Sequence, residues 1–110
     1  MVNLVLKNLK EIPSDFERDL VEKQAEKLRA YLDKRFAKYS KNLELEIIVN
    51  KSAATTLISA SLDLKSKKVV MAEEDKIPVK AATTLFDKFK KAVIRQYEHE
   101  KKEYEYKRKR

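Results

Sequence analysis

Hydrophobic and polar residues alternate along two short stretches of the chain, and two further stretches are rich in apolar and β-branched residues. Together they predict four β-strands. The stretches cover residues 2–9, 43–50, 56–64 and 69–74. The residues expected on the buried face of the second and third strands are Leu43, Leu45, Ile47, Val49, Ile58, Ala60, Leu62 and Leu64. Short connections join the last three strands, so we expect an antiparallel meander with one solvated face.

Two other segments have the spacing of amphipathic helices. Ser14 and Glu17 form an S-x-x-E capping box, and the helical pattern after it continues to about Tyr39 or Ser40. Pro78 suits the first turn of a second helix, which runs towards the C-terminus. The apolar stripe expected on this helix consists of Val79, Ala82, Leu85, Phe86, Phe89 and Val93.

The element order is therefore β-α-β-β-β-α, an α+β fold in which two helices cover one face of a four-stranded sheet. The apolar stripe of the second helix thins after Val93, so we expect about the last dozen residues to project beyond the core. We predict a single domain over residues 1–97, followed by a basic helical extension over residues 98–110.

Composition narrows the function classes. The chain has 110 residues, and 26 Lys and Arg outnumber 18 Asp and Glu, which favours a polyanionic partner such as nucleic acid or an acidic membrane surface. It has no Cys and no Gly, so thiolate metal sites and glycine-rich phosphate loops are excluded. No signal peptide or membrane span is recognisable, and we expect a cytoplasmic protein that is not an enzyme, does not bind a membrane and has no cofactor, metal or small-molecule substrate.

The basic residues are concentrated on particular helix faces. On a helical wheel Lys23, Lys27, Lys34 and Lys38 fall within about 60°, beside an acidic sector. For this first helix, either an RNA-binding stripe or a solvated face with i,i+4 pairs such as Asp19 with Lys23 fits the pattern.

The second helix favours a functional basic stripe more clearly, because its cations share a sector of about 80° away from the apolar stripe. They are Lys80, Lys88, Lys91, Arg95 and Lys102, and the chain ends with Lys107, Arg108, Lys109 and Arg110. We predict that all of these residues, with those of the first helix, contact RNA.

The expected contacts are with phosphates. The predicted strands contain no aromatic residue on which bases could stack, so recognition should come from helical Lys and Arg and be largely independent of sequence. Tyr104 and Tyr106 are weaker candidates for stacking, and Tyr97 is expected to pack. We expect Tyr31 and Tyr39 to lie in the core or at its rim.

The element order, the lysine-striped helices and the segment "VVMAEEDKIPVKAATTLFDKFKKAVIRQYEHEKK" together resemble the ribosome hibernation promoting factor family, also called ribosome-associated inhibitor A. The "DKF" of residues 87–89, followed by Lys91 and Arg95, resembles the family's D-K-L core with spaced basic residues. Residues 77–83 share only an Ala with the Asp-x-Tyr-x-Ala-Ile-Asp pattern of the family, so the chain resembles a divergent member.

The resemblance implies a double-stranded-RNA-binding-like fold that docks between the head and body of the small ribosomal subunit, against ribosomal RNA. Messenger and transfer RNA would then be blocked by occupancy. It also implies the short form of the family, without a separate dimerisation domain, and a monomer when free. Two alternatives remain at this point: a general structured-RNA-binding protein, and a scaffold that uses its basic face on acidic proteins.

Overall fold

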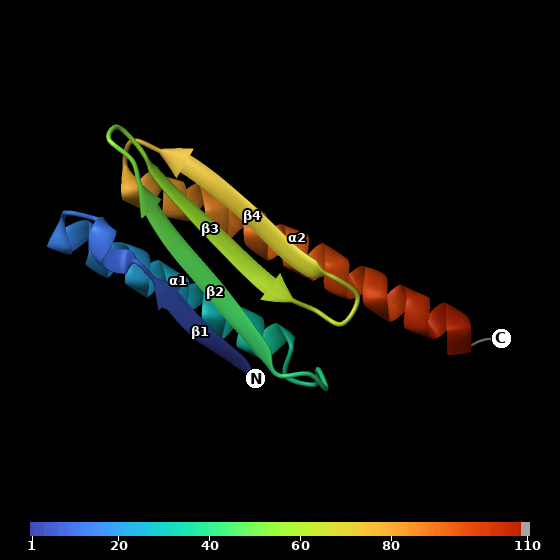
Figure 1. Ribbon diagram of the computed structural model, residues 1–110. Coiled ribbons are helices and arrows are strands. Elements are labelled where there is room, and N and C mark those ends of the chain that lie inside the picture. The colour runs from blue at the N-terminus through green and yellow to red at the C-terminus, as the bar shows by residue number, and fades with distance from the viewer. Residues whose placement is uncertain (109–110) are drawn as a thin grey trace.

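The computed structural model describes residues 1–108, and the side chains of residues 1–102. A sheet of four strands is covered on one face by two long helices, while its other face stays open (Figure 1). The elements are β1 (Val2–Lys7), the short 3₁₀-helix η1 (Leu9–Glu11), α1 (Asp15–Arg35), β2 (Leu43–Lys51), β3 (Thr56–Asp63), β4 (Lys68–Asp75) and α2 (Pro78–Arg108). The predicted α+β fold with the order β-α-β-β-β-α is confirmed.

The strands follow one another across the sheet in the order β1-β2-β3-β4. β1 pairs with β2 in parallel, with Val2 opposite Leu43, and α1 makes the crossover between them. β2, β3 and β4 form the expected antiparallel meander. Because this register aligns the alternating apolar residues of neighbouring strands, one continuous face of the sheet is apolar.

Two predicted boundaries were wrong: the end of the first strand by two residues, and the end of the first helix by four or five. The first strand ends at Lys7 and not at residue 9, because Asn8 takes a left-handed conformation (φ 62°, ψ 26°) and begins η1. Asn tolerates this conformation better than most residues do, so the break falls there.

The first helix ends at Arg35 and not at Tyr39 or Ser40. Phe36 leaves the helical region (φ −104°, ψ 22°) and is buried, and its ring stacks on Tyr97 with centroids 4.4 Å apart. Tyr39 meets both rings edge-on, at 5.1 Å and 5.4 Å. The chain therefore turns at the end of α1 so that two of its aromatic residues can pack against α2.

The core lies between the sheet and the two helices. Every residue predicted for the buried face of the second and third strands is buried, and so is the predicted stripe of α2, except that Val79 is half-buried. α1 contributes Val21, Ala25, Leu28 and Leu32 to the same core. At the start of α1, Ser14 Oγ accepts a hydrogen bond from the Glu17 N–H at 3.2 Å. A full capping box would also have a hydrogen bond from the Ser14 N–H to the Glu17 side chain, and this bond is not formed among the described residues.

α2 is the longest element and extends past the end of the sheet (Figure 1). This overhang contributes to an elongated molecule, with principal extents of 55 × 21 × 16 Å. The helix is nevertheless held beyond Tyr97, because Glu100 accepts hydrogen bonds from Tyr39 and from Ser66 in the β3–β4 turn. The predicted domain boundary after Tyr97 thus precedes a contact that fastens α2 to the rest of the fold.

Candidate nucleic-acid interface

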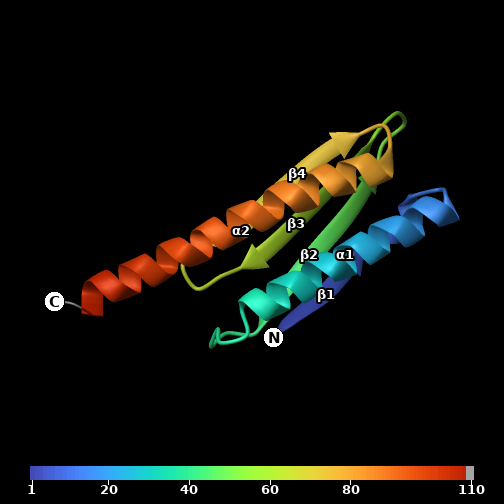
Figure 2. The ribbon, with the colours of Figure 1, turned by 180° about the vertical axis from the view of Figure 1, so that it is seen from behind.

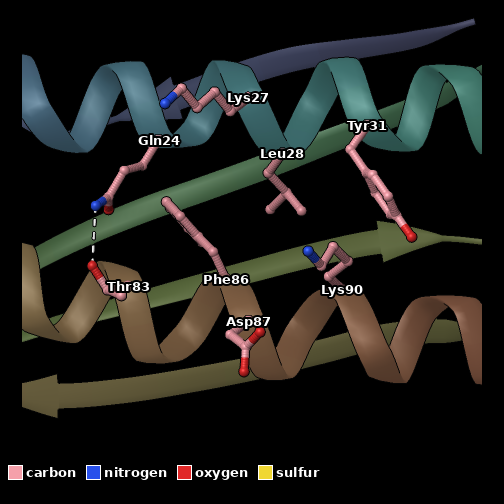
Figure 3. Close-up of a pocket in the computed structure, with 8 residues that line it drawn as sticks. All are labelled: Gln24, Lys27, Leu28, Tyr31, Thr83, Phe86, Asp87 and Lys90. Atoms are coloured by element: carbon pink, nitrogen blue, oxygen red, sulfur yellow. Dashed lines mark hydrogen bonds between the residues drawn. The ribbon is translucent and has the colours of Figure 1, made fainter.

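α1 and α2 lie side by side on the same face of the sheet and run in the same direction (Figure 2). They contact each other directly, and Gln24 Nε2 on α1 donates a hydrogen bond to Thr83 Oγ1 on α2 at 3.0 Å (Figure 3). Leu28 and Phe86 fill the space between them and are buried. This packing fixes the two helices as one surface.

The outer surface of these helices is called here the helix face. It carries exposed basic residues in both predicted stripes: Lys23, Lys27, Lys34, Lys80, Lys88, Lys91, Arg95 and Lys102. Lys38 is also exposed but lies in the turn after α1, so helical spacing does not place it in the stripe. Lys107 and Arg108 lie in the last turn of α2, and their side chains are outside the described residues, as are Lys109 and Arg110 entirely.

Two acidic residues of α1, Glu26 and Asp33, lie on the side of the helix next to β1. Asp33 accepts a hydrogen bond from the Val2 N–H at 2.8 Å, and Glu26 pairs with Arg29, which itself donates to the Val2 carbonyl. These acids thus have partners on the β1 side of the helix. The structure separates an acidic flank of α1, engaged with β1, from its basic stripe.

Three basic residues of the helix face are held by carboxylates. Lys23 pairs with Asp19 at 3.5 Å and Lys91 with Asp87 at 3.3 Å, both at i,i+4 spacing. Lys88 reaches across to Glu73 of β4 at 2.7 Å. Exposed pairs of this kind contribute about 0–1 kcal/mol, so they compete only weakly with a phosphate.

The other cations of the helix face have no ion-pair partner within residues 1–102. They are Lys27, Lys34, Lys80, Arg95 and Lys102. For the first helix, the sequence allowed either an RNA-binding stripe or a face neutralised by i,i+4 ion pairs. Lys23 has such a pair, with Asp19, whereas Lys27 and Lys34 have none among the described side chains. Unpaired cations can release the counterions of a polyanion on binding without first breaking an internal contact.

A groove separates the exposed rims of the two helices, and we call it the inter-helix groove. Its first cavity, of about 270 Å³, is lined by Gln24, Lys27, Leu28, Tyr31, Thr83, Phe86, Asp87 and Lys90 (Figure 3). A second cavity, of about 320 Å³, is lined by Tyr31, Lys90, Lys91, Ile94, Arg95 and Glu98. Tyr31 and Lys90 line both cavities, and the Lys90 ammonium lies 4.8 Å from the centre of the Tyr31 ring.

The open face of the sheet has the opposite character. Its charged residues alternate with the buried ones, and they are Lys7, Glu44, Glu46, Asp63, Lys68 and Glu74. Lys7 is paired with Glu46 at 3.0 Å, and Lys41 at the edge of this face pairs with Asp63 at 3.6 Å. Acids outnumber the lysines here, so this face suits a polyanion poorly.

A polar cluster ties α2 to the turns at the end of the sheet. The Tyr39 hydroxyl donates to Glu100 Oε1 at 2.6 Å and accepts from the Lys65 N–H at 2.8 Å. Ser66 Oγ donates to Glu100 Oε2 at 2.6 Å and accepts from Gln96 at 2.8 Å. Burial, together with the hydrogen bond to the Glu100 carboxylate, raises the pKa of Tyr39 to about 12.

Sequence reasoning missed the inter-helix groove and the role of Glu100. A helical wheel shows that Tyr31 stands beside the apolar sector, but it does not show that Lys90 of the other helix faces it. The helical spacing places Glu100 in line with the buried positions of the second helix. This position indicates a contact with the rest of the fold, but it does not identify Tyr39 and Ser66 as the partners. Tyr97 packs on Phe36 as predicted, Tyr39 is half-buried and Tyr31 lies at the rim, whereas Tyr104 and Tyr106 lie outside the described side chains.

Other kinds of site are not apparent in the part of the chain that the structure describes. Among its side chains no group of three or more His, Cys, Asp or Glu is arranged to hold a metal ion. None of its helices combines the length and the apolar character that crossing a bilayer requires. The exposed basic residues of the helix face therefore make it the candidate surface for binding a polyanion.

Two solved structures are similar to this chain. A ribosomal subunit interface protein from Coxiella burnetii matches with a TM-score of 0.53 and 16% sequence identity, over 87% of this chain and 96% of that one. The N-terminal domain of Protein Y from Thermus thermophilus matches with a TM-score of 0.47 and 24% identity, over 82% of this chain and 96% of that one. No protein-family model matches the sequence. No curated protein matches it significantly. At 16% identity, the first similarity establishes the fold that the chain has.

Proposed function

We propose that this protein binds the small ribosomal subunit through its helix face and inhibits translation by occupying the sites of messenger and transfer RNA. The observation that carries the proposal is the exposure of the basic stripes of two parallel helices on one side of the molecule. The fold shared with a ribosomal subunit interface protein supports the choice of the ribosome among polyanions.

The physical basis of this binding is phosphate neutralisation. Each phosphate contact contributes about 0.7 to 0.9 to the slope of log affinity against log salt. The five helical cations that have no ion-pair partner among the described side chains would therefore give a slope of about 4. Occupancy of the RNA path then suffices for inhibition, and no chemical step is needed.

The length of α2 fits this mode of binding. Lys102 is exposed and follows Glu100, which contacts Ser66 in the β3–β4 turn at the end of the sheet, so an RNA surface can approach it there. Between RNA walls the overhang of α2 would add phosphate contacts to those of the helix face. We propose that the free protein is a cytoplasmic monomer that docks as one rigid unit.

Sedimentation with purified small subunits over a range of salt concentrations tests the proposal. We expect saturable binding of one protein per subunit, a steep loss with salt, competition with transfer RNA and inhibition of cell-free translation. Equal affinity for free duplex RNA would instead indicate a general structured-RNA-binding protein. Binding to neither RNA would leave the acidic-protein scaffold, and undiminished translation at saturating protein would contradict inhibition.

A further inference from the structure

Tyr31 is an exposed aromatic residue in a cationic setting. Its side chain projects from α1 towards α2 at the inter-helix groove, and it is 38% exposed (Figure 3). Lys27 lies on the same helix, and Lys90 and Lys91 come from the other. An aromatic ring among cations is the arrangement with which proteins bind unpaired nucleic-acid bases and their phosphates.

The groove beside Tyr31 has an apolar floor. Leu28 and Phe86 line the first cavity and are buried, while its rim carries Lys27 and Lys90. Its volume of about 270 Å³ lies just below the range of ordinary small-molecule pockets, which start at about 300 Å³. It therefore suits a flat group the size of one base better than a larger ligand.

We propose that the inter-helix groove captures one unpaired base of a single-stranded RNA segment, with Tyr31 as the stacking platform and Lys27 and Lys91 on the flanking phosphates. The inference rests on the proposed function for its RNA partner, and it adds to phosphate binding a preference for unpaired nucleotides. Bases in a duplex are already stacked on their neighbours, so a duplex cannot place one in the groove without unpairing it.

The distribution of cations favours a strand over a free nucleotide. Lys27 lines the first cavity, whereas Lys91 and Arg95 line the second, and Tyr31 is common to both. A strand has phosphates on both sides of each base and can meet cations on both sides of the ring. A mononucleotide has its phosphate on one side only and leaves the cations on the other side of the ring without a phosphate.

Lys90 does not prevent this binding. Its ammonium lies over the Tyr31 ring at 4.8 Å, and an exposed cation–π contact is weaker than the stacking of a base on an aromatic side chain. A base can therefore replace the ammonium, which becomes available to a neighbouring phosphate. The acidic residues of the groove, Asp87 and Glu98, are exposed and can remain in solvent.

The absence of tryptophan from the chain makes a direct test practical. Tyr31→Trp places a single indole in the groove, and Phe16→Trp places one on the same helix at a residue that is 73% exposed and does not line either cavity. Both variants are titrated with an oligoadenylate of about six nucleotides, an abasic strand of equal length and adenosine monophosphate. Thermal melting confirms that each variant is folded.

We expect oligoadenylate to quench the fluorescence of Tyr31→Trp saturably and that of Phe16→Trp much less, while the abasic strand quenches neither. Tyr31→Ala should lower the affinity for oligoadenylate by about tenfold and leave that for the abasic strand unchanged. Equal quenching of the two indoles, or unchanged oligoadenylate affinity in Tyr31→Ala, would overturn the proposal. So would saturation by the mononucleotide at the affinity of the strand.

The assay separates this inference from the proposed function, because it uses no ribosome. Tyr31-dependent oligoadenylate binding without small-subunit binding would retain the groove and contradict the ribosomal function. Small-subunit binding without any effect of Tyr31→Ala on oligoadenylate would retain the function and contradict the groove.

Discussion

The helix face and the open face of the sheet are both solvated, but they differ in how many of their cations form ion pairs. On the open face, Lys7 pairs with Glu46, and Lys41 at its edge pairs with Asp63. On the helix face, five of the eight described cations, Lys27 and Arg95 among them, have no carboxylate partner among the described side chains, whereas on the open face only Lys68 lacks one. The positive charge of the chain is thus available for binding mainly on the side of the helices.

At physiological salt the two faces act almost independently. The Debye length is about 8 Å, while even the shortest principal extent of the molecule is 16 Å. The acids of the open face therefore do little to weaken the field over the helices. The net charge of +8 belongs to the whole chain. The positions of the carboxylates determine on which face the cations are available to bind a polyanion.

Reversing charges on the helix face should have the largest effect. The triple variant Lys27→Glu, Lys91→Glu and Arg95→Glu removes three exposed cations without touching a buried residue. We expect small-subunit affinity to fall on the order of 100-fold at physiological salt, with little change in melting temperature. Sedimentation binding and thermal unfolding measure the two quantities.

The matched control reverses Lys65, Lys67 and Lys68 in and beside the β3–β4 turn, and so changes net charge equally. We expect a loss of at most a few-fold. Equal losses in both variants would show that the effect is general and that the helix face has no special role. Lys88 is left out of the triple because its ion pair with Glu73 joins α2 to β4, so its reversal would place like charges between two elements. Lys91 pairs only with the exposed Asp87 of its own helix, where a like-charge contact costs little.

Glu100 provides a sharper comparison, because it is an acid of α2 whose carboxylate is turned away from the helix face. Glu100→Ala leaves the Tyr39 hydroxyl and Ser66 Oγ without their acceptor. We expect a loss of about 1–3 kcal/mol in the free energy of unfolding, measured by chemical denaturation.

Truncation after Lys102 is the control, and it should change the unfolding free energy by about 0.5 kcal/mol or less. This variant keeps the cluster around Glu100 and removes only residues beyond it. If Glu100→Ala were as stable as the full chain, Glu100 would not fasten the helix.

Tyr39 makes the same cluster sensitive to alkaline pH. Its pKa is about 12 in the folded protein, against 10.0 for an ordinary tyrosine. The unfolded chain therefore loses this proton first as the pH rises, so the stabilisation is complete below about pH 10 and is lost progressively towards about pH 12. Unfolding free energies measured across this window should fall.

Tyr39→Phe should flatten that decline, because it removes the titrating group while keeping the ring that packs on Phe36 and Tyr97. An equally steep decline in the variant would assign the alkaline sensitivity to other groups.

The sequence predicted the layers of the fold because each element has its own periodicity. The alternation from Leu43 to Val49 and the capping box at Ser14 are local signals, and both lead to the right element. The predicted end of α1 was wrong because Phe36 packs on Tyr97, a residue far away in the sequence, and local patterns do not reveal such a contact. Propensity alone favours a longer helix, and a tertiary contact overrides it.

The candidate site was predictable to a similar extent. Helical spacing identified the exposed cations, since a stripe on one helix is a local property. It could not show that Lys88 meets Glu73, nor that Lys90 lies over Tyr31, because both contacts depend on how separate elements are placed. The spacing of residues within each helix therefore predicts the basic surface but not its groove.

Removing single acids should give the smallest effect and the most specific one. Asp19→Asn frees Lys23 on the helix face, and Glu46→Gln frees Lys7 on the open face, so each variant removes one negative charge and one exposed ion pair. Both should alter stability by less than about 1 kcal/mol. Asp19→Asn should raise small-subunit affinity by about twofold and steepen the salt dependence by at most about 0.9, the contribution of one phosphate contact. Glu46→Gln should change neither, because Lys7 faces away from the helices. Equal gains in the two variants would mean that RNA senses the total charge of the protein and not the face that carries it.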